Sequence, residues 1–259
     1  MIDFHSQILS DVKLDLITLR EKVNAFNAAA EAGFNRIVVA PIWENGQTEN
    51  LDITQYKRVT NDMNKYLHER NIGTTVYFSQ EIQYEEQVIS LLKNSQIPTI
   101  NDSNYVFISF PLKDSTYYSV VEGIFQLQLN GYRPILCQVE KYPFIIHNMG
   151  IVKELIKRDV IIHLDARSML GYHGEGSKKT AKTLLKNNLV SLIGTNSKDK
   201  EDYQSCQKAY KKIKKIIGEE KFIELTQTNP NLILSNDLFY PEQPKDNKKE
   251  RKSFIRAIN

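Results

Sequence analysis

The sequence predicts an α/β protein in which parallel strands alternate with helices. Seven short apolar runs indicate buried strands, because they are rich in Val, Ile, Phe and Tyr and several are continuous instead of alternating. Their starts recur every 26 to 39 residues, which fits one strand and one helix per unit. The predicted strands are Ile2–His5, Arg36–Ala40, Thr75–Glu81, Tyr105–Phe110, Pro134–Gln138, Val160–Leu164 and Val190–Gly194.

Helical patterns occupy the intervals between these strands. In the first interval, apolar residues recur near one face and Gly33 follows, as is typical of a helix that ends at a glycine. From Asp199 onward a lysine-rich helix carries an apolar stripe that would pack on the barrel. The predicted helices are Leu19–Ala32, Thr54–His68, Ser119–Leu129 and Ser177–Asn187, and the stripe is Ala209, Ile213, Ile216 and Ile217.

Seven strand–helix units indicate a closed or nearly closed parallel barrel, and an open doubly wound sheet is the alternative. In both architectures the ligand site lies at the C-terminal ends of the strands. We expect one barrel domain over residues 1–240. Residues 241–259 are expected to form a flexible basic tail, because this polar segment has two prolines and no apolar periodicity.

The composition favours a cytoplasmic protein that does not bind nucleic acid. The 259 residues carry a formal net charge of only +3, which gives no polyanion-binding signal. The two cysteines lack CxxC spacing and suit a reducing compartment, and Cys137 is expected to pack as a small apolar residue. We find no signal peptide and no apolar run long enough to span a membrane. The basic tail is expected to make at most weak contact with the inner face of an anionic membrane.

Several motifs, collinear along the chain, carry a family resemblance. The opening MIDFHSQIL stands where the polymerase and histidinol phosphatase (PHP) superfamily has an HxH metal motif at the end of its first strand. Later segments resemble one branch of that superfamily, the capsule-type protein-tyrosine phosphatases. They are SQEIQ (Ser79–Gln83), YVFISFP (Tyr105–Pro111), LQLNGYRPILCQVEKY (Leu127–Tyr142), SMLGYHGEGSKKTA (Ser168–Ala181) and LIGTNSKDK (Leu192–Lys200).

The resemblance implies a PHP-type distorted seven-stranded (β/α)7 barrel with a manganese cluster at its mouth. It also implies hydrolysis of phosphotyrosine on a capsule-assembly tyrosine kinase, and it favours a homo-oligomer. In such a site a metal-held hydroxide attacks the phosphate, so several divalent ions must be held close together. Imidazoles and carboxylates are the ligands that hold them.

Most positions that correspond to these ligands hold residues that cannot replace them. His5 and Glu81 are retained, so one carboxylate remains where three are expected. Lys198 would add a positive charge to the site. Two unit positive charges about 4 Å apart repel each other by roughly 4 kcal/mol, and the repulsion between a lysine and a divalent ion is about twice as large. We therefore expect no metal cluster and no cofactor. The altered positions are Gln7, Ile42, Trp43, Ser109, Gln138, Asn196 and Lys198.

A rebuilt site is the alternative. His163 and Asp165 end the sixth predicted strand, and with His5 and Glu81 they would hold a single Mn²⁺ or Zn²⁺. The simpler interpretation makes His163 a barrel-lining residue and Asp165 a loop cap. In the absence of metals, Lys198 is expected to contact Glu81 or Asp165 in place of a lost cation.

Three functions follow from these observations. The first, which we favour, is a pseudophosphatase with a regulatory or scaffold role in capsular or exopolysaccharide synthesis, with a capsule-assembly tyrosine kinase as partner. The second is an active metal-dependent tyrosine phosphatase with the rebuilt site. The third is a binding module for phosphorylated sugars, in which Trp43 would stack on a sugar and Lys198 would bind a phosphate.

Overall fold

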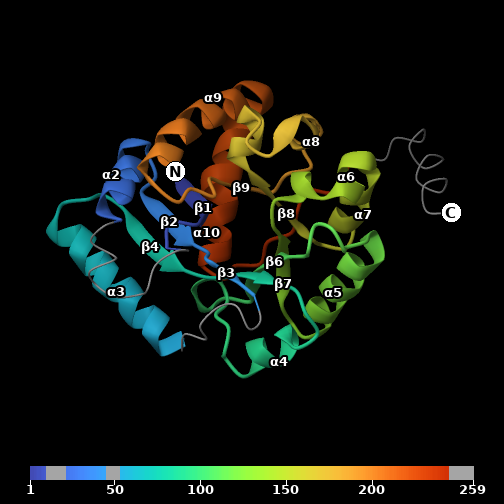
Figure 1. Ribbon diagram of the computed structural model, residues 1–259, viewed down its shortest axis with the longest axis horizontal. Helices are drawn as coiled ribbons and strands as arrows, with labels where there is room; N and C mark the ends of the chain where they lie inside the picture. Colours follow the sequence, from blue (N-terminus) through green and yellow to red (C-terminus); the bar gives the residue numbers. More distant parts are fainter. Residues whose placement is uncertain (10–21, 45–52, 245–259) are drawn as a thin grey trace.

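The computed structural model describes residues 1–9, 22–44 and 53–244, and its strands form a curled, parallel arrangement (Figure 1). A three-stranded sheet has the order β1-β2-β4, and a six-stranded sheet has the order β3-β5-β6-β7-β8-β9. The strands are β1 (Ile2–Ser6), β2 (Arg36–Val39), β3 (Ile42–Trp43), β4 (Thr75–Phe78), β5 (Glu81–Gln83), β6 (Tyr105–Ser109), β7 (Arg133–Leu136), β8 (Ile161–Asp165) and β9 (Leu192–Gly194).

The two sheets are joined by backbone hydrogen bonds. Just after β9, the N–H of Asn196 donates to the carbonyl of His5 at 2.8 Å, which connects the last strand to the first. On the other side, the chain runs directly from β2 into β3 and from β4 into β5, and the N–H of Ser79, which lies between β4 and β5, donates to the carbonyl of Val39 in β2 at 2.9 Å. These links close the parallel strands around a common interior, so the predicted barrel is confirmed and an open sheet does not describe it.

One predicted strand is divided in the structure. The run Thr75–Glu81 forms β4 and β5, which belong to different sheets, and the short β3 that pairs with β5 was not predicted. Pro41 lies between β2 and β3 and has no N–H to donate, so the ladder breaks there. The break leaves Glu81 at the start of β5.

Helices surround the strands (Figure 1). All the predicted helices are present, although residues 10–21, which include the start of the first, lie outside the described residues. The short helices α4, α6, α7 and α10 were not predicted, because so few turns show no clear period. The helices are α2 (Val23–Glu31), α3 (Ile53–Glu69), α4 (Val88–Lys93), α5 (Tyr117–Leu129), α6 (Pro143–His147), α7 (Gly150–Ile156), α8 (Gly174–Lys186), α9 (Lys200–Ile223) and α10 (Asn229–Leu234).

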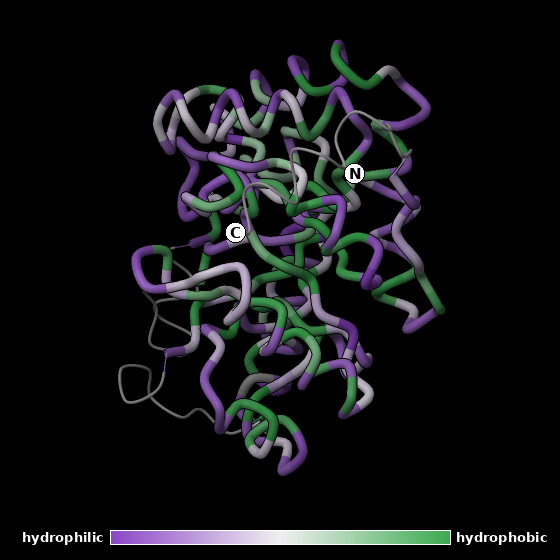
Figure 2. Tube along the Cα trace, turned by 90° about the vertical axis from the view of Figure 1, so that its right-hand side faces the viewer, coloured by the Kyte–Doolittle hydropathy of each residue, from purple (hydrophilic) through white to green (hydrophobic). Residues whose placement is uncertain are grey.

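Apolar side chains fill two regions of the molecule, and Figure 2 shows apolar stretches running through its middle. One region lies between strands and helices and includes Ala209 and Ile213 of the predicted stripe. The other gathers Phe4, Phe107 and Cys137 with residues of α10. No helix in the described ranges is both long enough and apolar enough to cross a membrane. Of the predicted tail, residues 245–259 lie outside the description.

Candidate functional site

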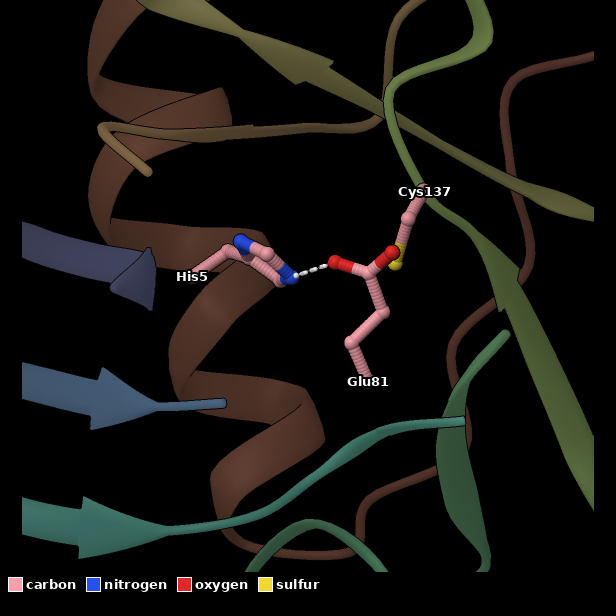
Figure 3. A group of neighbouring side chains, drawn as sticks. All are labelled: His5, Glu81 and Cys137. Carbon is pink, nitrogen blue, oxygen red and sulfur yellow. Dashed lines mark ion pairs between the residues drawn. The ribbon is translucent and has the colours of Figure 1, made fainter. Parts of the chain in front are cut away.

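Two ionisable side chains meet inside the barrel. Nε2 of His5, on β1, lies 2.8 Å from Oε2 of Glu81, and both side chains are buried (Figure 3). At this separation the imidazole and the carboxylate attract each other directly. Burial alone would raise the pKa of Glu81, but the proximity of His5, a hydrogen bond from Ser109 and the charge of Lys141 lower it below its usual value. Glu81 is therefore a carboxylate.

A thiol completes this group. Cys137 follows β7, and its sulfur, a carboxylate oxygen of Glu81 and a ring nitrogen of His5 all lie within 4.8 Å of one another. As predicted, Cys137 is buried among apolar side chains. Burial, and next the charge of Glu81, raise the pKa of Cys137 well above its usual range, so the isolated thiol keeps its proton. Sequence reasoning missed this convergence, because no cysteine motif marks it.

The side chain of Gln138 connects Glu81 to a lysine. Gln138 has a left-handed backbone, with φ of 52°. Its Nε2 lies 3.5 Å from Oε2 of Glu81, and its Oε1 accepts a hydrogen bond from Nζ of Lys141 at 2.7 Å. The Gln138 side chain therefore bridges the Lys141 ammonium group and the buried Glu81 carboxylate.

The predicted contact of Lys198 with Glu81 or Asp165 is wrong for the described residues. Lys198 is exposed, and its backbone N–H is held by Oδ2 of Asp202 at 2.9 Å, at the first turn of α9. Glu81 contacts His5 and Gln138 instead. The lysine whose charge lowers the pKa of Glu81 is Lys141. It lies on the short helix after β7, where it donates a hydrogen bond to Gln138.

His163, on β8, lies beside His5 with 4.9 Å between the ring centroids. Its Nδ1 accepts a hydrogen bond from the backbone N–H of Gln138 at 3.3 Å. Burial, and then the proximity of His5, lower the pKa of His163 well below its usual value, so the ring is neutral. Gly194 makes this arrangement possible, because a Cβ there would lie 2.6 Å from Nε2 of His163.

Asp165, at the end of β8, takes part in a separate network. Its Oδ1 accepts the N–H of Arg167 at 2.8 Å, which makes it the predicted loop cap, and its Oδ2 contacts Nε2 of His173 at 2.7 Å and Nδ2 of Asn196 at 3.3 Å. Burial alone would raise the pKa of Asp165, but His173 and Arg167 lower it. The three-ligand group found among the described residues contains neither Asp165 nor His163. Their role as metal ligands stays a prediction.

The remaining altered positions serve the fold. Nε2 of Gln7 donates to the carbonyl of Ala40 at 2.6 Å. Trp43 is 3% exposed and lies in the hydrophobic core, whereas its neighbour Ile42 is 42% exposed. Trp43 therefore has no free face for a sugar, which removes the stacking residue of the predicted binding module. Ser109, at the end of β6, hydrogen-bonds Glu81.

Glu140 is a buried acid that the sequence reasoning did not single out. Its Oε1 accepts hydrogen bonds from Oγ of Ser168 at 2.6 Å and from the N–H of Asp165 at 3.1 Å. Burial, and then the charge of Asp165, raise the pKa of Glu140 to about 8. The sequence did hold a signal for Glu140, because it lies in CQVEKY just after a predicted strand, where site residues are expected. The same signal applies to Arg167, which follows β8.

Comparison with known proteins matches this chain to a family and a fold. Residues 1–235 match the family described as capsular polysaccharide synthesis, CpsB/CapC. Tyrosine-protein phosphatase CpsB of Streptococcus pneumoniae is 28% identical over 251 residues, covering 92% of this chain and 100% of that protein. Crystal structures of YwqE from Bacillus subtilis and CpsB from Streptococcus pneumoniae, described as metal-dependent tyrosine phosphatases, match with a TM-score of 0.82 and 24% identity, covering 96% of this chain and 100% of the other.

A more distant structure supports the barrel type. Histidinol phosphate phosphatase from Lactococcus lactis, complexed with zinc, histidinol and phosphate, matches with a TM-score of 0.54 and 14% identity, covering 84% of this chain and 93% of that one. At this identity the likeness shows the fold alone. Together the two structural matches confirm the PHP-type barrel.

Proposed function

Because the chain belongs to the CpsB/CapC family of capsular polysaccharide synthesis, we propose that it is a catalytically impaired relative of that family's tyrosine phosphatases. Its role would be that of a regulator or scaffold in capsular or exopolysaccharide synthesis. The observation that carries this proposal is the donor set at the barrel mouth. There, His5 and Glu81 supply strong ligands, whereas the altered positions supply amides, a hydroxyl, apolar side chains and an ammonium group.

A manganese cluster does not fit these side chains. Clustered hard cations need several carboxylates and imidazoles. Ile42 offers no donor atom, and Trp43 is packed in the core. Oε1 of Gln138 already accepts a hydrogen bond from Lys141, and Asn196, whose Nδ2 donates to Asp165, can offer only its uncharged Oδ1. We therefore derive no reaction step through such a cluster.

The charges at the barrel mouth are balanced within the chain itself. Glu81 lies against His5, and Asp165 lies against His173 and 3.6 Å from Nε of Arg167. Nη1 of Arg167 also contacts Asp202 at 2.8 Å. Buried charges are stable when they are paired. This internal pairing supports a barrel that keeps its shape without a metal cluster.

The proposed partner is a capsule-assembly tyrosine kinase, and we propose that this chain meets it in the cytoplasm, at the inner face of the membrane. A barrel that keeps the family's outer shape can retain the binding surface after the catalytic ligands are lost, because fold and site are maintained by different residues. We also propose that the chain forms a homo-oligomer, as the family resemblance implies.

An active metal-dependent tyrosine phosphatase with a rebuilt site is the second candidate. The observation that favours it is the convergence of His5 and Glu81 with the sulfur of Cys137, which differs from the predicted rebuilt set of His5, Glu81, His163 and Asp165. One divalent ion held there would activate water with fewer ligands than the family's cluster.

A phosphatase assay separates the two candidates. Purified protein is incubated with a phosphotyrosine peptide and Mn²⁺, Fe²⁺ or Zn²⁺ in turn, with CpsB of Streptococcus pneumoniae as the positive control. We expect no phosphate release above that of a His5→Ala, Glu81→Gln double variant. Metal-dependent release that this double variant lacks would establish the second candidate instead.

A further inference from the structure

Beyond the proposed function, we propose that His5, Glu81 and Cys137 bind one zinc ion per chain. The ligand atoms are an imidazole nitrogen, a carboxylate oxygen and a sulfur, which come from β1, from β5 and from the segment after β7. Figure 3 shows the carboxylate of Glu81 between the other two side chains. Within residues 1–9, 22–44 and 53–244, this is the group of three His, Cys, Asp or Glu side chains whose ligand atoms converge.

The separations are close to those of a tetrahedral zinc site. With zinc–ligand bonds of about 2.0–2.3 Å, ligand atoms around zinc lie roughly 3.3–3.7 Å apart. Nε2 of His5 and Oε2 of Glu81 are 2.8 Å apart, and the sulfur of Cys137 is within 4.8 Å of both ligand atoms. Small side-chain rotations would therefore move Nε2 of His5 away from Oε2 of Glu81 and bring the sulfur of Cys137 closer to both residues. Zinc would take the place of the direct contact between His5 and Glu81, because both residues would become ligands of the same ion.

The charge of the group fits one divalent ion. Zinc binding displaces the thiol proton of Cys137 to solvent and forms a zinc–thiolate bond. Nε2 of His5 donates a lone pair only when it carries no proton, so a proton on Nε2 is also released to solvent and the neutral ring keeps its proton on Nδ1. The thiolate and the Glu81 carboxylate then carry two negative charges, which one Zn²⁺ neutralises. A neutral assembly is what a site with His5, Glu81 and Cys137 all buried requires. A second divalent ion would leave an unbalanced buried charge.

The chemistry of the sulfur favours zinc over manganese. Thiolates are soft ligands that select zinc, whereas manganese prefers oxygen donors, and the general order of affinities places zinc above manganese. Cys137 corresponds to no ligand position in the resemblance described above, so the proposed site keeps His5 and Glu81, adds a thiolate from outside the family's ligand set and holds a different metal.

Gln138 provides a fourth ligand. Its Nε2 lies 3.5 Å from Oε2 of Glu81, and a half-turn of the amide would present Oε1 to the ion and release Lys141. Four protein ligands leave no open position for a reactive water, as in structural zinc sites. The ion would thus brace the first, fifth and seventh strands of the barrel without supplying catalysis.

The test uses the full chain, stripped of metal with a chelator and titrated separately with ZnCl₂ and MnCl₂ by calorimetry. CoCl₂ serves as a spectroscopic probe, because a cobalt–thiolate bond gives a charge-transfer absorption that nitrogen and oxygen ligands do not. The matched variants are Cys137→Ser and Cys206→Ser, since both cysteines are buried but the sulfur of Cys206 lies 3.4 Å from Oγ of Ser197 instead. Circular dichroism checks that each variant is folded.

We expect one zinc per chain, much weaker manganese binding, and a cobalt–thiolate band that Cys137→Ser loses and Cys206→Ser keeps. Zinc affinity should fall in Cys137→Ser by more than the roughly 10–100-fold that loss of an outer-shell partner costs. Absence of stoichiometric zinc, or of the thiolate band in the unaltered protein, would overturn the proposal even if the variants do not fold. Phosphatase activity measured on the same samples bears only on the proposed function.

Discussion

Nε2 of His173 meets Oδ2 of Asp165 at 2.7 Å, which fastens the loop before α8 to the end of β8. The same carboxylate accepts the N–H of Arg167, and the guanidinium of Arg167 reaches Asp202 on α9 at 2.8 Å. Asp165 therefore connects three segments of the barrel mouth through buried, charge-assisted contacts.

Asp165→Ala should lower the free energy of unfolding by about 3–5 kcal/mol, because it leaves the buried Arg167 short of a partner. The pKa of Asp165 is lower in the folded state, so its contribution is present above its ordinary value of 3.8 and is lost as pH falls through the folded pKa. Urea denaturation measures both effects. Glu175→Ala, which removes an exposed pair with Lys178, should leave the free energy of unfolding close to that of the parent, because solvent screens exposed ion pairs. Equal losses in the two variants would contradict this account.

Glu140→Gln should flatten the dependence of stability on pH. The folded carboxyl, with a pKa of about 8, keeps a proton that the unfolded carboxyl releases above its ordinary value of 4.5. The free energy of unfolding of the parent should therefore fall as pH rises through this window. Glutamine keeps an oxygen for Ser168 and does not titrate. Urea denaturation at a series of pH values would measure the slopes, and identical slopes would show that Glu140 is already ionised in the fold.

Gly194→Ala should destabilise the barrel, because its Cβ would lie 2.6 Å from Nε2 of His163 and 2.6 Å from Cβ of His5. Overpacking of a core typically costs about 1–3 kcal/mol. Gly73→Ala is the control, since a Cβ there meets nothing within 4 Å. Thermal denaturation of both variants measures the difference, and a Gly194→Ala protein as stable as the control would show that the two histidines have room to move.

Asn196→Asp should also be destabilising, although it would place a carboxylate at one of the altered positions. Nδ2 of Asn196 donates to Asp165 at 3.3 Å, and an aspartate would replace this donor with a like charge. We expect a loss of about 1–3 kcal/mol by urea denaturation. Asn188→Asp, at an exposed position with a similar φ of 54°, should change stability by about 0.5 kcal/mol or less. An Asn196→Asp protein as stable as its parent would indicate that another cation balances the added charge.

The strands were predictable because parallel strands are buried on both faces and leave continuous apolar runs. The division of Thr75–Glu81 into β4 and β5 was not, because it depends on Pro41, which lies between the neighbouring strands β2 and β3 and interrupts the ladder. Nor could single-strand patterns reveal how the chain after β9 returns to β1, since that contact joins His5 to Asn196, which are far apart in the sequence.

Residue chemistry alone determined what the barrel mouth lacks. An isoleucine at position 42 has no donor atom, and an amide at 138 or 196 carries no charge, whatever the fold around them. Only the tertiary structure decided which side chains meet: Cys137 with His5 and Glu81, Lys141 in place of Lys198 near the carboxylate, and Trp43 in the core. Those contacts depend on how strands that are far apart in the sequence pack against one another, and local sequence patterns do not determine that packing.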